Sequence, residues 1–158
     1  MFAGLEWCPA SAEVLHHGPL VGDDERAAIT SRARMLGLPI VWPPWSPAPV
    51  VAAMRVASLA AERGVGGAFV LAASRLIFCG GFDIDDPEIL AEAAAAAGID
   101  LDEMLSAARD AGRDGPIEET GRRLLAAGAD RLPALRVGRM LFCGEDRLGA
   151  ALAARATG

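Results

Sequence analysis

Three cysteines, Cys8, Cys79 and Cys143, are the residues with the most evident chemistry. Their odd number and wide spacing exclude a disulfide framework, and no two of them stand in a Cys-x-x-Cys pair. Cys143 directly precedes Gly144, where we expect a helix to begin, and a helix dipole there favours a thiolate. Cys143 is therefore a candidate nucleophile, with the alternative that all three cysteines are small apolar residues at strand and helix ends.

A metal centre is the weaker interpretation of the remaining ligand-type residues. Cys8, His16 and His17 lack a fourth ligand and a recognised zinc spacing, so we predict no metal site and a solvated loop over 10–22. The carboxylates of 83–88 are explained by helix initiation at Asp86-Pro87.

Two tryptophans and one arginine are candidates for binding a ligand. Trp42 and Trp45 stand in a proline-rich segment, 38–47, that cannot form a regular helix. They wall a ligand cleft or, alternatively, cover a junction between helices and a sheet. Arg55 follows on the next helix, where it holds an anionic group by bidentate bonds or is exposed or paired within the chain.

The chain's last quarter predicts the element that positions Cys143. Segment 131–144 contains two apolar runs joined by Gly138-Arg139, which indicates a β-hairpin with a type II′ turn. Pro133 opens the first strand, and the Leu132-Pro133 bond is one of the few that adopt cis at low cost. A terminal helix is predicted over 145–156.

Capping residues and glycines predict a series of helices over the residues that precede the hairpin. A short strand is predicted before them, at 5–9. The helix before Gly64 is predicted to begin at Pro47, capped by Ser46. The predicted helices are 23–36, 47–63, 66–78, 87–97, 101–111 and 116–128.

Three stretches resemble one branch of the DsbA-like thioredoxin superfamily, the 2-hydroxychromene-2-carboxylate isomerases and kappa-class glutathione transferases. Segment 142–148 is similar to its F-x-G-x-D-R-L pattern, 81–90 to G-x-D-I-x-D-P-x-x-L, and Ala53-Met54-Arg55 to A-M-R-A. The resemblance implies an α/β class, an incomplete thioredoxin-like fold with a small cis-proline hairpin sheet and a large all-helical insert. The first strand and helix of that family, with Cys-x-x-Cys or a catalytic serine, have no counterpart in the sequence.

The expected organisation is one DsbA-like domain, 1–158, with a thioredoxin-like lobe, 1–22 and 129–158, and a helical insert, 23–128. Glutathione or another low-molecular-weight thiol is the implied cofactor, and an aromatic or hydrophobic acid the implied substrate. The implied cofactor-binding residues are Leu132, Pro133, Trp42, Trp45, Arg55 and Asp146.

The resemblance implies a thiol-dependent isomerase, transferase or oxidoreductase relative, weakly active or inactive alone without the missing motif. Two alternatives stay open: a non-catalytic dimeric binding or assembly module, and a single-cysteine thiol protein acting through Cys143. Unpaired strand edges favour a homodimer.

Composition limits the cellular compartments and the kinds of partner that we expect for this protein. A net charge of −6 without a basic cluster argues against nucleic acid. No apolar run is long enough to span a membrane, and the first residues lack signal-peptide features. We therefore expect a cytoplasmic protein with no membrane partner.

Overall fold

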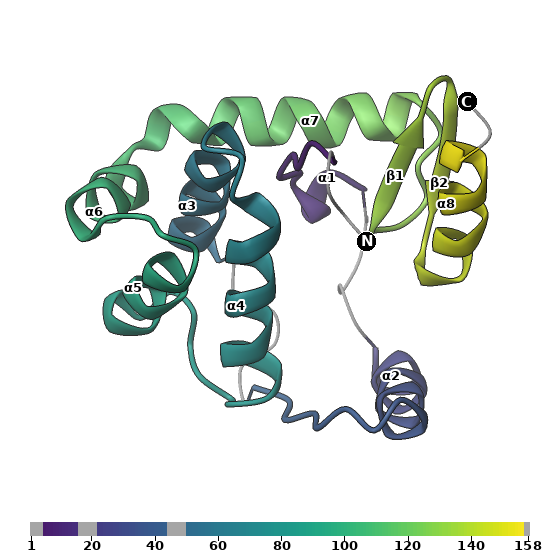
Figure 1. Ribbon diagram of the computed structural model, residues 1–158, viewed down its shortest axis with the longest axis horizontal. Helices are drawn as coiled ribbons and strands as arrows, with labels where there is room; N and C mark the ends of the chain where they lie inside the picture. The colour runs from purple at the N-terminus through teal and green to yellow at the C-terminus, as the bar shows by residue number, and fades with distance from the viewer. Residues whose placement is uncertain (1–4, 16–21, 44–49, 157–158) are drawn as a thin grey trace. The chain divides into compact units, whose positions relative to one another are not determined.

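The computed structural model describes residues 5–15, 22–43 and 50–156, and Figure 1 shows its elements. The chain divides into two compact units. Unit 1 comprises residues 1–9 and 21–114, and unit 2 comprises residues 10–20 and 115–158. Trp45, Ser46 and the His16-His17 pair lie outside the described residues.

Unit 1 is built from helices. Its elements are α2 (Asp23–Met35), α3 (Val51–Glu62), α4 (Gly66–Phe78), α5 (Pro87–Ala96), α6 (Leu101–Arg109) and the short 3-10 helix η1 (Ala111–Arg113). Helix α3 packs against α4 and α6, and α4 packs against α5. The predicted helices are thus present, and most of their observed ends differ by one or two residues.

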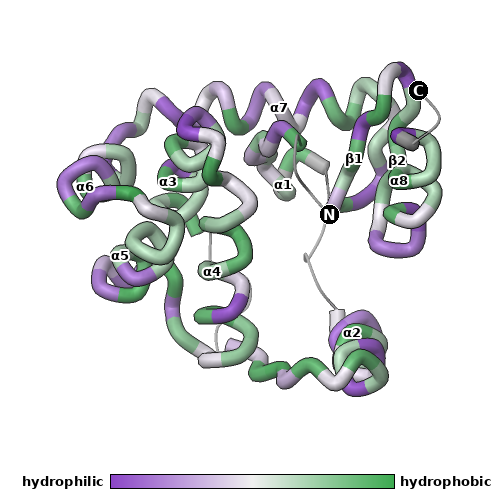
Figure 2. The backbone as a smooth tube through the Cα atoms, in the orientation of Figure 1, coloured by the Kyte–Doolittle hydropathy of each residue, from purple (hydrophilic) through white to green (hydrophobic). Residues whose placement is uncertain are grey.

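The core of unit 1 lies between α3, α4, α5 and α6. Val56, Leu90 and Met104 are its largest fully buried side chains, and Phe69 and several alanines complete the cluster. Alanines bring the helix backbones close together, so much of this core is packed backbone rather than large side chains. Figure 2 shows that α3 and α5 are largely hydrophobic, whereas α2 and α6 carry more hydrophilic residues.

Aspartates begin several of these helices. The side chain of Asp86 accepts from the main-chain N–H of Glu88 at 2.8 Å, and Asp100 accepts from Asp102 at 2.9 Å. The helix-initiation interpretation of Asp86-Pro87 is therefore confirmed. The role of Asp85 was not predicted from the sequence. Its Oδ1 accepts a hydrogen bond from Ala53 N at 3.0 Å and so caps α3 from a distant segment.

Glycines end the helices in the predicted way at Gly37, Gly64, Gly98 and Gly128, all of which have positive φ. After α5, Ile99 N bonds to Ala94 O at 2.9 Å, which closes the Schellman pattern around Gly98. The predicted helix end at Gly112 was wrong. Helix α6 stops at Arg109 because Asp110 is extended and its side chain accepts from Gly112 N, which begins η1.

The strand predicted at 5–9 is absent, since residues 5–10 form no regular element. Instead Trp7 lies against the start of α4. A Cβ added to Gly66 would stand 2.8 Å from Trp7 Cβ, so the indole side chain approaches α4 where no side chain intervenes. The Trp7 side chain of this segment therefore packs on a helix.

Unit 2 contains α1 (Ala12–Leu15), α7 (Asp114–Ala126, of which Asp114 itself belongs to unit 1), strands β1 (Ala134–Val137) and β2 (Met140–Cys143), the 3-10 helix η2 (Glu145–Arg147) and α8 (Leu148–Ala156). The strands pair antiparallel with Val137 opposite Met140 and Ala134 opposite Cys143. Gly138 has a φ of +59° and Arg139 a negative φ, which fits the predicted type II′ turn. Helix α8 packs on both strands.

The described residues are thus mostly helical with a small two-stranded antiparallel sheet, consistent with an α/β class. The single domain with a helical insert over 23–128 remains a prediction, and the two compact units divide after Asp114. Helix α7, after its first residue, therefore groups with the hairpin rather than with the other helices.

Candidate functional site

Leu132 and Pro133 lie directly before β1, where both are exposed. The peptide bond between them is cis. Gly144 N donates to Pro133 O at 2.9 Å, which extends the hairpin ladder by one pair. Proline has no N–H to return to the Gly144 carbonyl, and this carbonyl accepts from Arg147 N at 3.2 Å instead. The chain after β2 is thereby tied to Pro133 and to η2.

Two opposite charges converge over Gly144. A Cβ added there would stand 2.7 Å from Asp146 Oδ1 and 2.9 Å from Arg131 Nε. Arg131 Nη2 is 3.9 Å from Asp146 Oδ2, and Arg131 Nε is 3.8 Å from Asp130 Oδ1, so these ion pairs are loose. The side chains of Arg131 and Asp146 are 54 % and 64 % exposed, which leaves both groups accessible to a ligand. We name Arg131, Leu132, Pro133, Gly144 and Asp146 the hairpin-end site.

Arg131 is not among the site residues predicted from the sequence. The available signal was its position, since it immediately precedes Leu132-Pro133, two of the residues that the family resemblance implies for cofactor binding. A cation next to the strand entry and an acid after the second strand are brought together by the hairpin itself.

Cys143 is the last residue of β2 and is half-buried. Gly144 is the N-cap of the 3-10 helix η2, which continues directly into α8 at Leu148, so a helical segment begins after Cys143 as predicted, with a 3-10 first turn. A reactive thiolate at Cys143 remains a prediction. Cys8 and Cys79 are exposed, and the cysteines form no disulfide. No group of three metal-ligand side chains occurs among the described residues.

Arg55 is paired within unit 1. Its Nε and Nη2 donate to Asp114 Oδ1 and Oδ2 at 2.7 and 2.6 Å, and its Nη1 donates to the Ala108 carbonyl at 3.1 Å. This bidentate bond lowers the pKa of Asp114 and raises that of Arg55, although desolvation opposes both shifts. Arg55 thus links α3 to the end of α6 and the start of α7, as the alternative of an internally paired arginine anticipated.

Trp42 connects α2 to α4. Its Nε1 donates to Thr30 Oγ1 at 2.9 Å, and the Arg26 guanidinium lies 5.3 Å from the ring centroid. The ring meets Phe78 edge-on, with 6.1 Å between centroids. These contacts join two helices of unit 1. Trp45, the other candidate tryptophan, lies outside the described residues.

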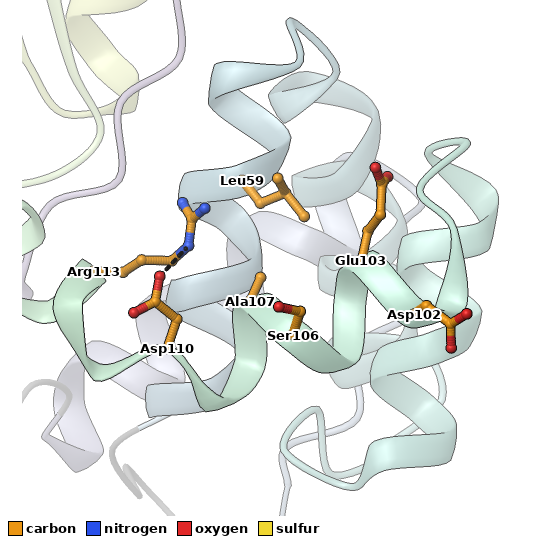
Figure 3. Close-up of a pocket in the computed structure, with 7 residues that line it drawn as sticks. All are labelled: Leu59, Asp102, Glu103, Ser106, Ala107, Asp110 and Arg113. Atoms are coloured by element: carbon orange, nitrogen blue, oxygen red, sulfur yellow. Dashed lines mark ion pairs between the residues drawn. The ribbon is translucent and has the colours of Figure 1, made fainter.

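Unit 1 also has an open hollow of about 370 Å³ between α3, α6 and η1 (Figure 3). It is lined by Leu59, Asp102, Glu103, Ser106, Ala107, Asp110 and Arg113. Arg113 is already bound, because its Nη1 and Nη2 donate to the Glu62 carboxylate at 2.8 and 3.2 Å. The hollow contains none of the predicted site residues.

The hairpin therefore brings together Leu132, Pro133, Cys143 and Asp146. Trp42 and Arg55 belong to unit 1, and each is engaged by neighbouring helices. The structure gives these two residues packing and pairing roles within their own unit.

The family model of the DSBA-like thioredoxin domain matches residues 23–154. A search of curated proteins gives no match. Among the described residues, no helix combines the length and the hydropathy that crossing a bilayer requires.

Proposed function

We propose, because the chain belongs to the DSBA-like thioredoxin domain family, that it binds a low-molecular-weight thiol of the glutathione type at the hairpin-end site. The observation that carries the proposal is the pair of exposed, opposite charges of Arg131 and Asp146 over Gly144, beside the exposed Leu132-Pro133 segment. Glutathione carries carboxylates and an ammonium group, so it offers a partner to each charge. Leu132 and Pro133 provide the apolar surface next to them.

The family suggests thiol–disulfide chemistry, but dithiol exchange needs two cysteines that form a disulfide with one another. Residues 1–158 contain no Cys-x-x-Cys. We therefore propose a bound thiol as the reactive sulfur, as in the isomerase and kappa-class transferase branch, with an aromatic or hydrophobic acid as substrate. Residues 1–158 alone are expected to have weak activity or none, and no reduction of insulin.

Arg131 replaces Arg55 in our proposal as the residue that holds a carboxylate. The Arg55 guanidinium already donates to Asp114 and to Ala108, whereas the Arg131 ion pairs are long and exposed. A ligand carboxylate would have to displace Asp114 to reach the bidentate face of Arg55. Contacts of the bound thiol with Trp42, Trp45 or Arg55 remain predictions from the family resemblance.

Calorimetric titration of glutathione tests the proposal. Arg131→Ala and Asp146→Asn should each weaken binding about tenfold, since each removes one charge-assisted contact. Arg139→Ala is the matched control, because Arg139 is an exposed arginine of the hairpin turn. Equal affinity of all four proteins, or no heat of binding at millimolar glutathione, would contradict a thiol site at the hairpin end.

A non-catalytic assembly role is the second candidate, and one observation favours it: the outer edge of β1 has no hydrogen-bond partner among the described residues. The third, a single-cysteine role for Cys143, gains no support from its half-buried position at the end of β2. Cytoplasmic location remains a prediction.

A further inference from the structure

The hydrogen-bond pattern of the hairpin determines which main-chain groups of β1 point away from β2. In an antiparallel pair, residues alternate between positions that exchange hydrogen bonds with the partner strand and positions that do not. Gly144 N donates to Pro133 O, and the register places Leu135 opposite Phe142 and Val137 opposite Met140. Pro133, Leu135 and Val137 therefore face β2 with their main-chain polar groups.

It follows that Ala134 and Arg136 direct their N–H and C=O groups to the outer edge of β1. Within the part of the chain that the structure describes, the sheet contains only β1 and β2, and no hydrogen bond to these four groups is found. Unpaired strand groups of this kind bind another strand readily.

We infer that the outer edge of β1 pairs antiparallel with β1 of a second copy of this chain, about a two-fold axis at Leu135. In this register Ala134 of each copy exchanges both main-chain hydrogen bonds with Arg136 of the other. Leu135 lies opposite its own counterpart at a position where the two strands are closest. Because Leu135 is half-buried in one copy, this contact removes further apolar surface from water.

Charge selects this register over its neighbours. An axis at Leu135 sets the cationic Arg136 opposite the small, neutral Ala134. An axis at Arg136 would set two guanidinium groups directly opposite one another, which destabilises a strand pair. An axis at Ala134 would set Arg136 opposite Leu132, which lies outside the strand. The edge is thus complementary to itself in one register.

Pairing in this way has a stabilising consequence. A two-stranded sheet is at the lower limit of stability, and strands added at its edge strengthen it. The two-fold arrangement uses the same edge of both copies, so the assembly closes as a dimer and does not extend into a fibre. This inference is independent of thiol binding.

Site-directed cross-linking tests the register. Leu135→Cys, in a background with the native cysteines changed to serine, should form a disulfide-linked dimer under mild oxidation. The two Cα atoms would be about 4.5 Å apart, within the range a disulfide tolerates. Val137→Cys in the same background is the matched control, since its counterpart would lie roughly 13 Å along the strand.

Sedimentation of the unmodified chain provides the second test. Arg136→Pro removes an outward N–H that the hairpin itself does not use, so it should weaken dimerisation about tenfold or more with retained circular dichroism. Arg136→Ala keeps that N–H and should still dimerise. The inference would be overturned by a monomer at every concentration, by equal cross-linking at positions 135 and 137, or by dimerisation unaffected by Arg136→Pro. A monomer at every concentration would instead favour a different peptide as the partner of this edge.

Discussion

Gly144 N donates to Pro133 O at 2.9 Å, and this one hydrogen bond joins the two ends of the hairpin. It positions Gly144 with a φ of +87° and a ψ of 158°, a conformation that only glycine adopts readily. Arg131 and Asp146 lie so close to its Cα that a Cβ would collide with both. The glycine in the stretch similar to F-x-G-x-D-R-L therefore has a steric and conformational explanation.

Gly144→Ala is expected to destabilise unit 2. The new Cβ meets Asp146 Oδ1 and Arg131 Nε, and the alanine must adopt a positive φ. We therefore expect a loss of about 2 kcal/mol in the free energy of unfolding. Urea denaturation followed by circular dichroism measures it.

The matched control for that substitution is Gly149→Ala in α8. A Cβ at Gly149 meets no atom within 4 Å, and alanine is the better helix former, so stability should be unchanged or rise by up to about 1 kcal/mol. Similar losses in both variants would show that the conformation of Gly144 is not the cause.

The Arg55–Asp114 pair predicts a pH dependence. Because Arg55 lowers the pKa of Asp114 in the folded chain, the pair contributes its full stability above the ordinary aspartate pKa of about 4 and loses it as the pH falls further. Asp114→Asn should lower the melting temperature by about 3–6 °C near neutral pH and reduce the loss in acid.

Glu119→Gln is the comparison for Asp114→Asn. Its carboxylate has a lowered pKa because Arg122 and Arg123 hydrogen-bond it, but these three side chains are on the exposed surface of one helix. Water screens such pairs, so Glu119→Gln should change the melting temperature less. An equal effect of the two variants across the pH range would contradict a special role of the Arg55–Asp114 pair.

The helices and the hairpin could be predicted because their signals are local. Asp86-Pro87 caps α5, Gly98 ends it, and Gly138-Arg139 forms the turn between β1 and β2. Segment 5–9 could not be predicted correctly, since its short apolar pattern suits a strand and its conformation depends on Trp7 packing against distant α4. The cap that Asp85 provides to α3 is equally non-local.

In the candidate site, too, only neighbours within one local element could be predicted. Leu132, Pro133 and Asp146 are joined by one hairpin, so their proximity follows from the predicted turn. The partner of Arg55 could not be read from the sequence, because Asp114 becomes its neighbour only when α3 and α6 pack together.

The cysteines are expected to differ in their rate of alkylation. Cys8 and Cys79 are exposed, whereas Cys143 is half-buried at the end of β2. Iodoacetamide should therefore label Cys8 and Cys79 several-fold faster than Cys143 in the folded protein. Peptide mass spectrometry over a time course measures the three rates, and urea-unfolded protein, in which they should converge, is the control. Fastest labelling at Cys143 would support the single-cysteine role.

The contact between Trp42 and Thr30 predicts how firmly α2 is held. Trp42→Phe keeps an aromatic ring against Phe78 but removes the Nε1–H that bonds to Thr30 Oγ1. A lost hydrogen bond of about 1 kcal/mol should speed amide hydrogen exchange in α2 about fivefold and leave α5 unchanged, because α5 belongs to the buried core. Thr30→Val removes the acceptor instead, and the double variant should exchange no faster than either single one. If α2 exchanges at the wild-type rate in Trp42→Phe, the indole contributes through its surface alone, and Trp42 becomes available again as part of a ligand cleft.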